Sequence, residues 1–258
     1  MKAEGNSTLL NEIRDYWNEH IHDLEIVKHP IGSKGFFEDL DEYRFDKLRY
    51  LPRVVDFNGY KGKKVLEIGC GAGIDLIRFA RGGAQVTGVD ISETAIDLAK
   101  KNFTINGLKA DLRVMNGEAL DFKDNSFVLV YVHGVLQYTA NSRQMAEESL
   151  RVLKKGGEFI GMVYNRKGWL NTLSKLMKVG LEHEDAPVLD MYTIDEFKEL
   201  LSGFREIKIV PERFPVKTRL HKGIKAFFFN TLFVNMFNLI PRSLVRPLGW
   251  HIMAFCIK

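Results

Sequence analysis

The chain has 258 residues, of which 45% are hydrophobic and 27% are charged, and its net charge is +4. This length and composition fit one large α/β domain and exclude a repeat or low-complexity protein. Two cysteines, Cys70 and Cys256, are too few for a disulfide framework, and charged residues at the amino terminus replace the apolar run of a signal peptide. We therefore expect a cytoplasmic protein with free thiols, at most peripheral to a membrane.

Residues 1–60 precede the first predicted strand and contain aromatic-rich helical patterns such as RDYWNEH and FFEDLDEYRFDKLRYL. Patterns of this period favour helices with one apolar face. We expect this segment to form an N-terminal helical cap over a second unit, residues 61–258, rather than an independent fold.

Short apolar runs alternate with segments of helical period through the middle of the chain. Strands are expected at 63–69, 84–90, 111–117, 126–134 and 158–165. Helices are expected at 74–81, after Ser92 as an N-cap, and from Ser142 to the Gly156–Gly157 pair. With two further strands at 205–214 and 249–258, after a helix at 193–204, the order predicts a Rossmann-like, mostly parallel seven-stranded sheet. Helices should cover both of its faces.

An insertion at 215–247 separates the last two predicted strands. Residues 213–258 hold eight Lys and Arg and no Asp or Glu, so residues 1–212 carry a net charge of −4. Such an asymmetry fits a surface for nucleic acid, anionic lipid or an acidic substrate, and it equally fits a solvated basic face.

The apolar stretch 225–241 within this insertion is shorter than the roughly 20 residues that cross a bilayer. On a helical wheel, its Asn230, Thr231, Asn235 and Asn238 share one stripe and leave a broad apolar face. Such a helix can lie in a lipid interface, line an acceptor pocket, join a dimer or pack on the protein's own cap. We favour a lid over an apolar acceptor and leave open a membrane contact through 222–246 and a homodimer.

The turn after the first strand carries Gly69, Gly71 and Gly73, a G-x-G-x-G spacing. The dinucleotide fingerprint G-x-G-x-x-G would need its third glycine at Ile74. Glu67 lies two residues before the first glycine, where a carboxylate would repel a pyrophosphate. The same carboxylate suits a ligand that carries a sulfonium and an ammonium group, so the spacing opposes a nicotinamide-dependent dehydrogenase.

Five motifs in order make the chain similar to one enzyme class. They are VLEIGCGAG, VTGVDIS, NGEALDF, FVLVYVHGVLQYT and RVLKKGGEFI, between about residues 60 and 165. Through them the chain resembles the class I S-adenosylmethionine-dependent methyltransferases, in the ubiquinone/menaquinone-type (methyltransferase type 11-like) branch. It departs from the pattern at Val128, where an acidic residue is usual, and at Gln137-Tyr138, where many relatives have His-His. Both departures lie on the acceptor side.

The resemblance implies S-adenosyl-L-methionine as cofactor and S-adenosyl-L-homocysteine as product. It implies that Asp90 binds the ribose hydroxyls, that Glu118 faces the adenine amine and that the Ala119 N–H faces a ring nitrogen. Cys70 is interpreted as a small residue that allows close backbone approach. The candidate cofactor-binding residues are Glu67, Gly69, Cys70, Gly71, Gly73, Asp90, Ile91, Gly117, Glu118, Ala119 and His133.

The implied reaction is a direct SN2-type methyl transfer to a small, apolar or aromatic acceptor, in which a general base contributes about 10²–10⁴-fold. The candidate catalytic residues are His133, Tyr138 and His183. For His133 the alternative is a backbone that only borders the cofactor. The segment LEHEDAP at 181–187 is interpreted as a solvated loop rather than a metal site, since adjacent residues rarely converge on one ion. No metal is expected, and His20, His22 and His29 are less favoured bases.

Two other functions stay open at this point. One is methylation of RNA or another macromolecule, supported only by the basic carboxyl-terminal region. No specific nucleic-acid partner is expected, because the N/D-P-P-Y type of motif is replaced by VHGV. The other is a catalytically silent scaffold that binds the cofactor.

Overall fold

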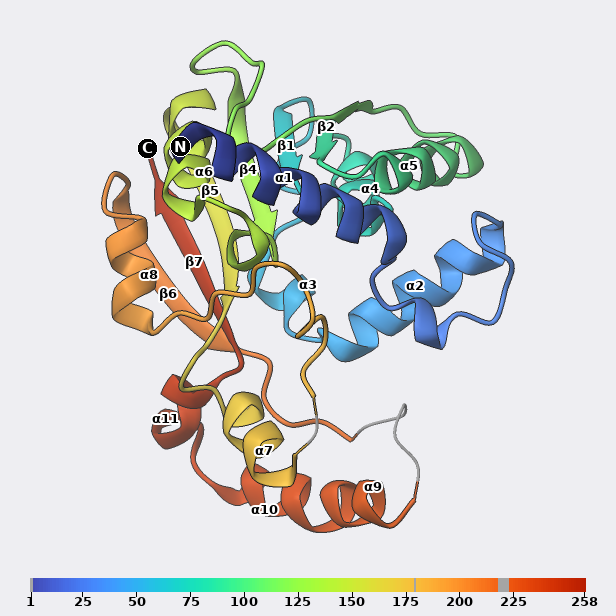
Figure 1. Ribbon diagram of the computed structural model, residues 1–258, viewed down its shortest axis with the longest axis vertical. Coiled ribbons are helices and arrows are strands. Elements are labelled where there is room, and N and C mark those ends of the chain that lie inside the picture. The colour runs from blue at the N-terminus through green and yellow to red at the C-terminus, as the bar shows by residue number, and fades with distance from the viewer. Residues whose placement is uncertain (1, 179, 218–222) are drawn as a thin grey trace.

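The computed structural model describes residues 2–178, 180–217 and 223–258. A seven-stranded sheet with the order β3-β2-β1-β4-β5-β7-β6 forms its centre (Figure 1). The strands are β1 Lys64–Ile68, β2 Gln85–Asp90, β3 Asp111–Val114, β4 Phe127–His133, β5 Leu153–Tyr164, β6 Arg205–Glu212 and β7 His251–Ile257.

The first five strands run parallel, whereas β7 lies antiparallel between β5 and β6. The predicted mostly parallel seven-stranded sheet is confirmed. Strand β1 has β2 on one side and β4 on the other, so the strand order reverses beside it. In open α/β sheets, ligands bind at the carboxyl ends of the strands next to such a reversal.

Alternate residues of the central strands enter the cores on the two faces of the sheet. In β1, Val65 packs into one core and Leu66 into the other, and in β4 Leu129 and Val130 do the same. All four side chains are fully buried, as expected for parallel strands covered on both sides.

The helices that follow these strands are α4 Ile74–Arg81, α5 Glu93–Ile105, α6 Ser142–Val152 and α8 Ile194–Leu200, with a 3-10 turn, η2, at Leu136–Tyr138. Ser92 caps α5 as predicted, since its hydroxyl accepts from the Ala95 N–H at 3.1 Å. The predicted continuation of α6 to Gly156–Gly157 is wrong. Leu153 is already extended and pairs with Phe127 of β4, so the buried strand β5 ends the helix.

The N-terminal segment contains α1 Lys2–Glu19, the 3-10 turn η1 Leu24–Ile26, α2 Lys34–Lys47 and α3 Leu51–Val54. The end of α1 is fixed to the start of α5. The Ser92 hydroxyl donates to the Trp17 carbonyl oxygen at 2.9 Å, and it lies 2.9 Å from the Asn18 side-chain oxygen. Helix α2 is tied to α4 by Arg78 and Asp41 at 2.8 Å.

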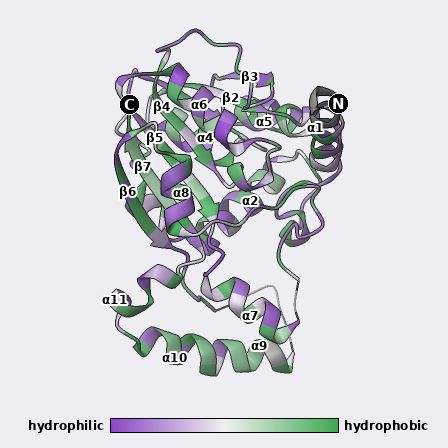
Figure 2. Cartoon of the chain, turned by 60° about the vertical axis from the view of Figure 1, so that its left-hand side comes forward, coloured by the Kyte–Doolittle hydropathy of each residue, from purple (hydrophilic) through white to green (hydrophobic). Residues whose placement is uncertain are grey.

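The last helices are α7 Trp169–Met177, α9 Ile224–Phe228, the π-helical turn η3 Phe229–Phe233, α10 Val234–Leu239, α11 Arg242–Val245 and the 3-10 turn η4 Arg246–Leu248. The helix expected at 225–241 is thus present, interrupted by a π turn, whereas α7 was not predicted. These elements form a lobe that projects from the sheet (Figures 1 and 2). Among the described helices, none combines the length and apolar character that crossing a membrane requires.

Candidate functional site

A cavity opens at the carboxyl ends of β1, β2 and β4, and residues of α1 and α2 also line it. We call its two parts the glycine end and the histidine end. The glycine end is lined by Glu67, Gly69, Cys70, Gly71, Asp90, Ile91, Met115, Asn116 and Gly117. The histidine end is lined by Arg44, Lys47, Asp75, His133, Tyr138, Tyr164, Glu182, Arg213 and His251.

The turn after β1 has its three glycines in the left-handed region, with φ of 70° at Gly69, 52° at Gly71 and 75° at Gly73. A Cβ at Gly69 would lie 2.2 Å from Cγ2 of Val135, whereas a Cβ at Gly71 would enter open space. Gly69 is therefore required for packing, while Gly71 leaves room for a ligand against the backbone. Gly73 precedes α4 and does not line the cavity.

Glu67, near the end of β1, is 4% exposed, and its Oε2 has no hydrogen-bond partner within the described residues. Burial and the nearby Asp75 raise the pKa of this carboxyl well above its usual range. An ionised carboxylate in this position is costly unless a cation or hydrogen-bond donor joins it. The residue fits a cationic ligand group at the glycine end.

Asp90 ends β2, and its two carboxylate oxygens accept from the Gly71 N–H at 2.9 Å and the Ser92 N–H at 3.0 Å. Each oxygen keeps further acceptor capacity, which two hydroxyl groups of a ribose could use. Burial raises the pKa of this carboxyl, and a ligand that donates hydrogen bonds would lower it again. Ile91 and Cys70 line the same end, and burial raises the pKa of the Cys70 thiol.

The segment after β3 holds the residues predicted to face the adenine. One oxygen of the Glu118 carboxylate accepts from the Thr139 hydroxyl and from the Asn141 N–H at 2.9 Å. The Ala119 N–H already donates to the Asn116 carbonyl oxygen at 3.1 Å. Neither Glu118 nor Ala119 lines the cavity, and their adenine contacts stay predictions. Met115, Asn116 and Gly117 line it instead.

A chain of hydrogen bonds links the polar groups of the histidine end. Arg44 donates to Nδ1 of His133 at 3.3 Å, and Nε2 of His133 lies 3.2 Å from the Tyr50 hydroxyl. That hydroxyl lies 2.6 Å from Nδ1 of His251, whose Nε2 accepts from Arg213 at 2.9 Å. Each guanidinium therefore uses the lone pair of one imidazole, which leaves the other ring nitrogen to carry the proton.

This arrangement keeps both histidines neutral. Burial and the neighbouring Arg44 lower the pKa of His133 to about 3, and burial and Arg213 hold the pKa of His251 well below its usual range. Because the lone pair of His133 is already engaged, this side chain is not poised to take a proton from an acceptor. Its predicted role as a base is not supported by this geometry.

Arg44 also forms a buried ion pair that the sequence patterns did not reveal. Its Nε and Nη2 donate to the two oxygens of Asp75 at 2.6 Å and 2.5 Å, and the Tyr131 hydroxyl adds a third bond at 2.8 Å. Although burial acts to raise the pKa of Asp75, the Arg44 guanidinium holds it below its usual range. The pair joins α2 of the cap to the start of α4.

Tyr138 lines the cavity as predicted, but burial raises the pKa of its hydroxyl, so it stays protonated. His183 does not line the cavity. Its Nε2 lies 2.8 Å from Nδ1 of His22, and its Nδ1 lies 3.1 Å from the Tyr16 hydroxyl. Burial and His22 lower its pKa to about 4. The structure therefore brings two of the three predicted catalytic residues, His133 and Tyr138, to the cavity and leaves His183 behind its wall.

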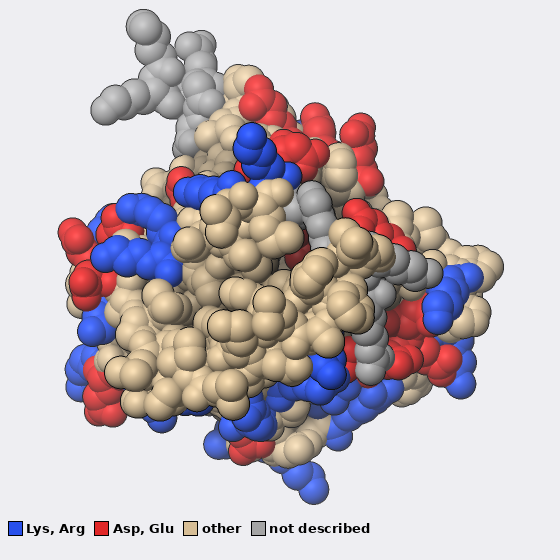
Figure 3. Space-filling view, turned by 90° about the horizontal axis from the view of Figure 1, so that it is seen from below, with Lys and Arg blue, Asp and Glu red and all other residues tan. Residues whose placement is uncertain are grey.

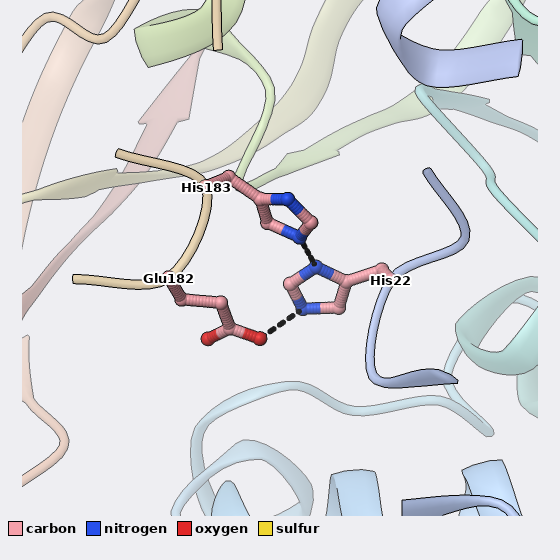
Figure 4. Close-up of side chains that lie close together, drawn as sticks. All are labelled: His22, Glu182 and His183. Atoms are coloured by element: carbon pink, nitrogen blue, oxygen red, sulfur yellow. Dashed lines mark hydrogen bonds and ion pairs between the residues drawn. The ribbon is translucent and has the colours of Figure 1, made fainter. Parts of the chain in front are cut away.

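His22, Glu182 and His183 form the group in the described chain that could be considered for a metal ion. Figure 4 shows them in a row, with His22 between the other two: its Nδ1 faces His183 and its Nε2 lies 3.4 Å from Glu182. Lys47 donates to both oxygens of Glu182 at 3.0 Å and to Asp23 at 2.8 Å. Each potential metal ligand thus contacts another side chain of the protein. We infer that these three residues connect the cap to the loop at 181–185.

Known proteins resemble this chain in sequence and in fold. Residues 66–161 match a family described as a methyltransferase domain. The chain is 32% identical over 139 residues to a ubiquinone biosynthesis O-methyltransferase of Idiomarina loihiensis, which covers 53% of this chain and 56% of that protein. It is 36% identical over 145 residues to an uncharacterised protein of Methanocaldococcus jannaschii, covering 55% of this chain and 65% of the other. The matched part of the chain thus spans between 56% and 65% of the length of these two relatives.

The fold has relatives among solved structures as well. A geranyl diphosphate C-methyltransferase of Streptomyces coelicolor, in complex with Mg²⁺, geranyl diphosphate and S-adenosyl-L-homocysteine, superposes with a TM-score of 0.62 at 15% identity. The match covers 96% of this chain and 97% of that one. The domain match, the similar relatives and the fold together show that residues 66–161 form a methyltransferase domain with the class I, S-adenosylmethionine-dependent fold.

Proposed function

We propose that this protein transfers the methyl group of S-adenosylmethionine to a small acceptor held at the histidine end of the cavity. The observation that carries the proposal is Glu67, a buried carboxylate with an unpartnered oxygen beside the glycine turn. The cofactor supplies a methyl group already activated on a sulfonium. The chain must add an acidic group that receives the ammonium, acceptors for the ribose hydroxyls, and alignment of the two reactants.

Each of these needs has a residue. Glu67 would hold the ammonium group of the cofactor, and Asp90 would accept from its ribose hydroxyls. The backbone at Gly71 leaves open space for close approach. Alignment of two reactants in this way can supply about 7–11 kcal/mol of the barrier reduction.

The histidine end supports an acceptor with a flat apolar body. Trp17, Tyr138 and Tyr164 line the cavity, and the Trp17 and Tyr138 rings meet edge to face at 5.1 Å. Arg213 lines it too, and the hydrogen bond described for its guanidinium goes to the neutral His251. A carboxylate or another acceptor group on the substrate would therefore find a donor there. The name of the Idiomarina relative makes an aromatic hydroxyl the first acceptor group to test.

His20 is the residue we propose for proton transfer. It lines the cavity, and its Nδ1 lies 2.8 Å from the Tyr16 carbonyl oxygen, so Nδ1 carries the proton and Nε2 keeps its lone pair. Within the described residues, Nε2 has no hydrogen-bond partner, in contrast to both nitrogens of His133. An imidazole nitrogen with a free lone pair, on a residue that lines the cavity, is what a general base requires.

The test uses purified protein, methyl-labelled S-adenosylmethionine and a whole-cell extract, with the label then counted in organic, aqueous and macromolecular fractions. Label in the organic or aqueous small-molecule fraction supports the proposal. Label in RNA or protein overturns the small-molecule acceptor but keeps methyl transfer, and label nowhere favours a silent scaffold.

Cofactor binding is measured separately by calorimetry. Asp90→Ala should weaken binding at least about tenfold, since a hydrogen bond to a charged group contributes about 1.5–3 kcal/mol. Asp97→Ala is the matched control, because Asp97 lies on the exposed face of α5 and pairs only with Lys100 at 3.3 Å. Equal affinities of the two variants would remove Asp90 from the site.

A further inference from the structure

The lobe, defined as residues 167–178 and 214–248, is apolar on two sides. Its α9, η3 and α10 follow one another from Ile224 to Leu239. The inner side packs on Trp169 of α7, with ring centroids 6.2 Å from Phe229, 5.9 Å from Phe233 and 6.4 Å from Phe237. These contacts give the lobe its own small core.

The outer side has no cover in the described structure. Among the described residues, fifteen large apolar side chains are exposed, and eleven of them belong to the lobe. They are Leu176, Val216, Ile224, Phe227, Phe228, Leu232, Met236, Leu239, Ile240, Leu244 and Leu248. Ile224 is 75% exposed and Leu239 is 84% exposed, so most of each of these two side chains lies in solvent. Seen from below, the end of the molecule where the lobe lies shows a broad continuous surface of uncharged residues (Figure 3).

The spacing of this outer set is helical. Positions 224, 227, 228, 232, 236, 239 and 240 recur at three or four residues and share one stripe. Isolated exposed apolar residues are ordinary, but a contiguous stripe of this length marks a contact surface.

The charge of the lobe is uniform. Its sequence holds nine Lys and Arg and no Asp or Glu, which leaves 28 basic against 33 acidic residues in the rest of the chain. Several cations border the apolar side: Arg242 lies 4.3 Å above the Phe214 ring, and Arg49, Lys217 and Arg242 line a groove along α10. Lys and Arg also edge the uncharged surface in Figure 3.

The apolar stripe and its cationic border together distinguish a lipid bilayer from a second copy of the chain as the binding partner of this surface. In a two-fold dimer the same surface meets itself, so the cationic borders would face each other with no acidic residue of the lobe between them. A bilayer surface offers apolar depth for the stripe and anionic headgroups for the border. We propose that the lobe docks on an anionic lipid bilayer, with the stretch from Ile224 to Leu239 lying in the plane of the interface.

The experiment is co-sedimentation of the full chain with vesicles of phosphatidylcholine alone or mixed with phosphatidylglycerol. We expect binding to the mixed vesicles, weaker binding to the neutral ones and release by salt. The triple variant Leu232→Ser, Met236→Ser and Leu239→Ser should bind at least about tenfold more weakly. The control triple Ile31→Ser, Ile105→Ser and Val114→Ser removes exposed apolar side chains outside the lobe and should bind like the original chain.

A second variant tests the charge. Removing two cations by Arg242→Gln and Arg246→Gln should weaken binding about fivefold for each, and only to the anionic vesicles. Equal sedimentation of the lobe and control triples would overturn the proposal, as would the absence of binding to anionic vesicles. A dimer in solution that the lobe triple dissolves would assign the surface to a second copy instead. None of these readouts depends on methyl transfer.

Discussion

The buried pair of Arg44 and Asp75 allows a prediction whose size follows from the structure. The side chains of Asp75 and Arg44 are 1% and 18% exposed. The substitution Arg44→Met keeps the apolar stem and removes the guanidinium. Of the hydrogen bonds that the described residues make to Asp75, the one from the Tyr131 hydroxyl at 2.8 Å then remains. Leaving one partner of a buried pair uncompensated costs about 3–5 kcal/mol. We expect a loss near the lower value, because that hydroxyl remains, out of a total stability of about 5–15 kcal/mol.

The assay is urea unfolding at neutral pH, and Arg49→Met is the control because Arg49 is 63% exposed beside Asp46. The control should lose at most about 1 kcal/mol. Adding Asp75→Asn to Arg44→Met should restore part of the loss, since it removes the unpaired charge. A loss below about 1 kcal/mol for Arg44→Met at neutral pH would refute the reasoning.

The pH dependence gives this prediction a sign. With Arg44 present, the pKa of Asp75 is lowered, so the pair stabilises the fold above the unfolded value of about 4 and the benefit disappears as pH falls through the lowered pKa. Without Arg44, burial would raise this pKa. The penalty in Arg44→Met should then grow as pH rises above about 4 and shrink as pH falls back towards that value. A difference between the two proteins that does not change with pH would contradict this assignment.

The remaining predictions concern the cofactor and the cap. Because burial raises the pKa of Glu67, binding of the cationic cofactor at neutral pH should release up to one proton, seen in calorimetry as a heat that depends on the buffer, and Glu67→Gln should abolish that dependence. Gly69→Ala should abolish cofactor binding, since its Cβ would lie 2.2 Å from Val135, whereas Gly71→Ala should cost about 1–2 kcal/mol in unfolding for its positive φ and leave the fold intact. Ser92→Ala should cost about 1 kcal/mol and speed proteolysis of α1, because it loses both the α5 cap and the bond to Trp17.

The glycine end could be predicted from the sequence because its chemistry follows from local backbone geometry. Three glycines with positive φ and an acidic residue at the end of each of two adjacent strands lie at fixed spacing from strands that periodicity already reveals. The hydrogen bonds at this end that the sequence did not predict have equally local causes. The hydrogen bonds of Glu118 to Thr139 and Asn141, and of Ala119 to Asn116, depend on loop conformations that no spacing encodes.

The hydrogen-bond chain of the histidine end could not be predicted, because four distant segments build it. Arg44 and Tyr50 come from the cap, His133 from β4, Arg213 from the residue after β6 and His251 from β7. Each side chain is ordinary in its own segment, and only the antiparallel return of β7 beside β5 brings His251 opposite Tyr164. The position of Tyr138 on the wall was predictable from the end of β4, whereas the engagement of His133 by Arg44 depends on how α2 crosses the sheet.

This division has a consequence for specificity. The residues that would hold the cofactor lie on β1, β2 and the turns after them, while many of those that would contact the acceptor come from the cap, from the residue after β6 and from β7. Arg213 contacts both the lobe and the cavity. Its carbonyl oxygen accepts from the Trp169 indole at 2.8 Å, while its guanidinium donates to His251 in the cavity. Arg213 thus links the lobe to the histidine end, because its backbone bonds Trp169 of the lobe core and its side chain bonds the His251 imidazole. A lobe seated on a bilayer would therefore hold the backbone of the residue that we expect to contact the acceptor.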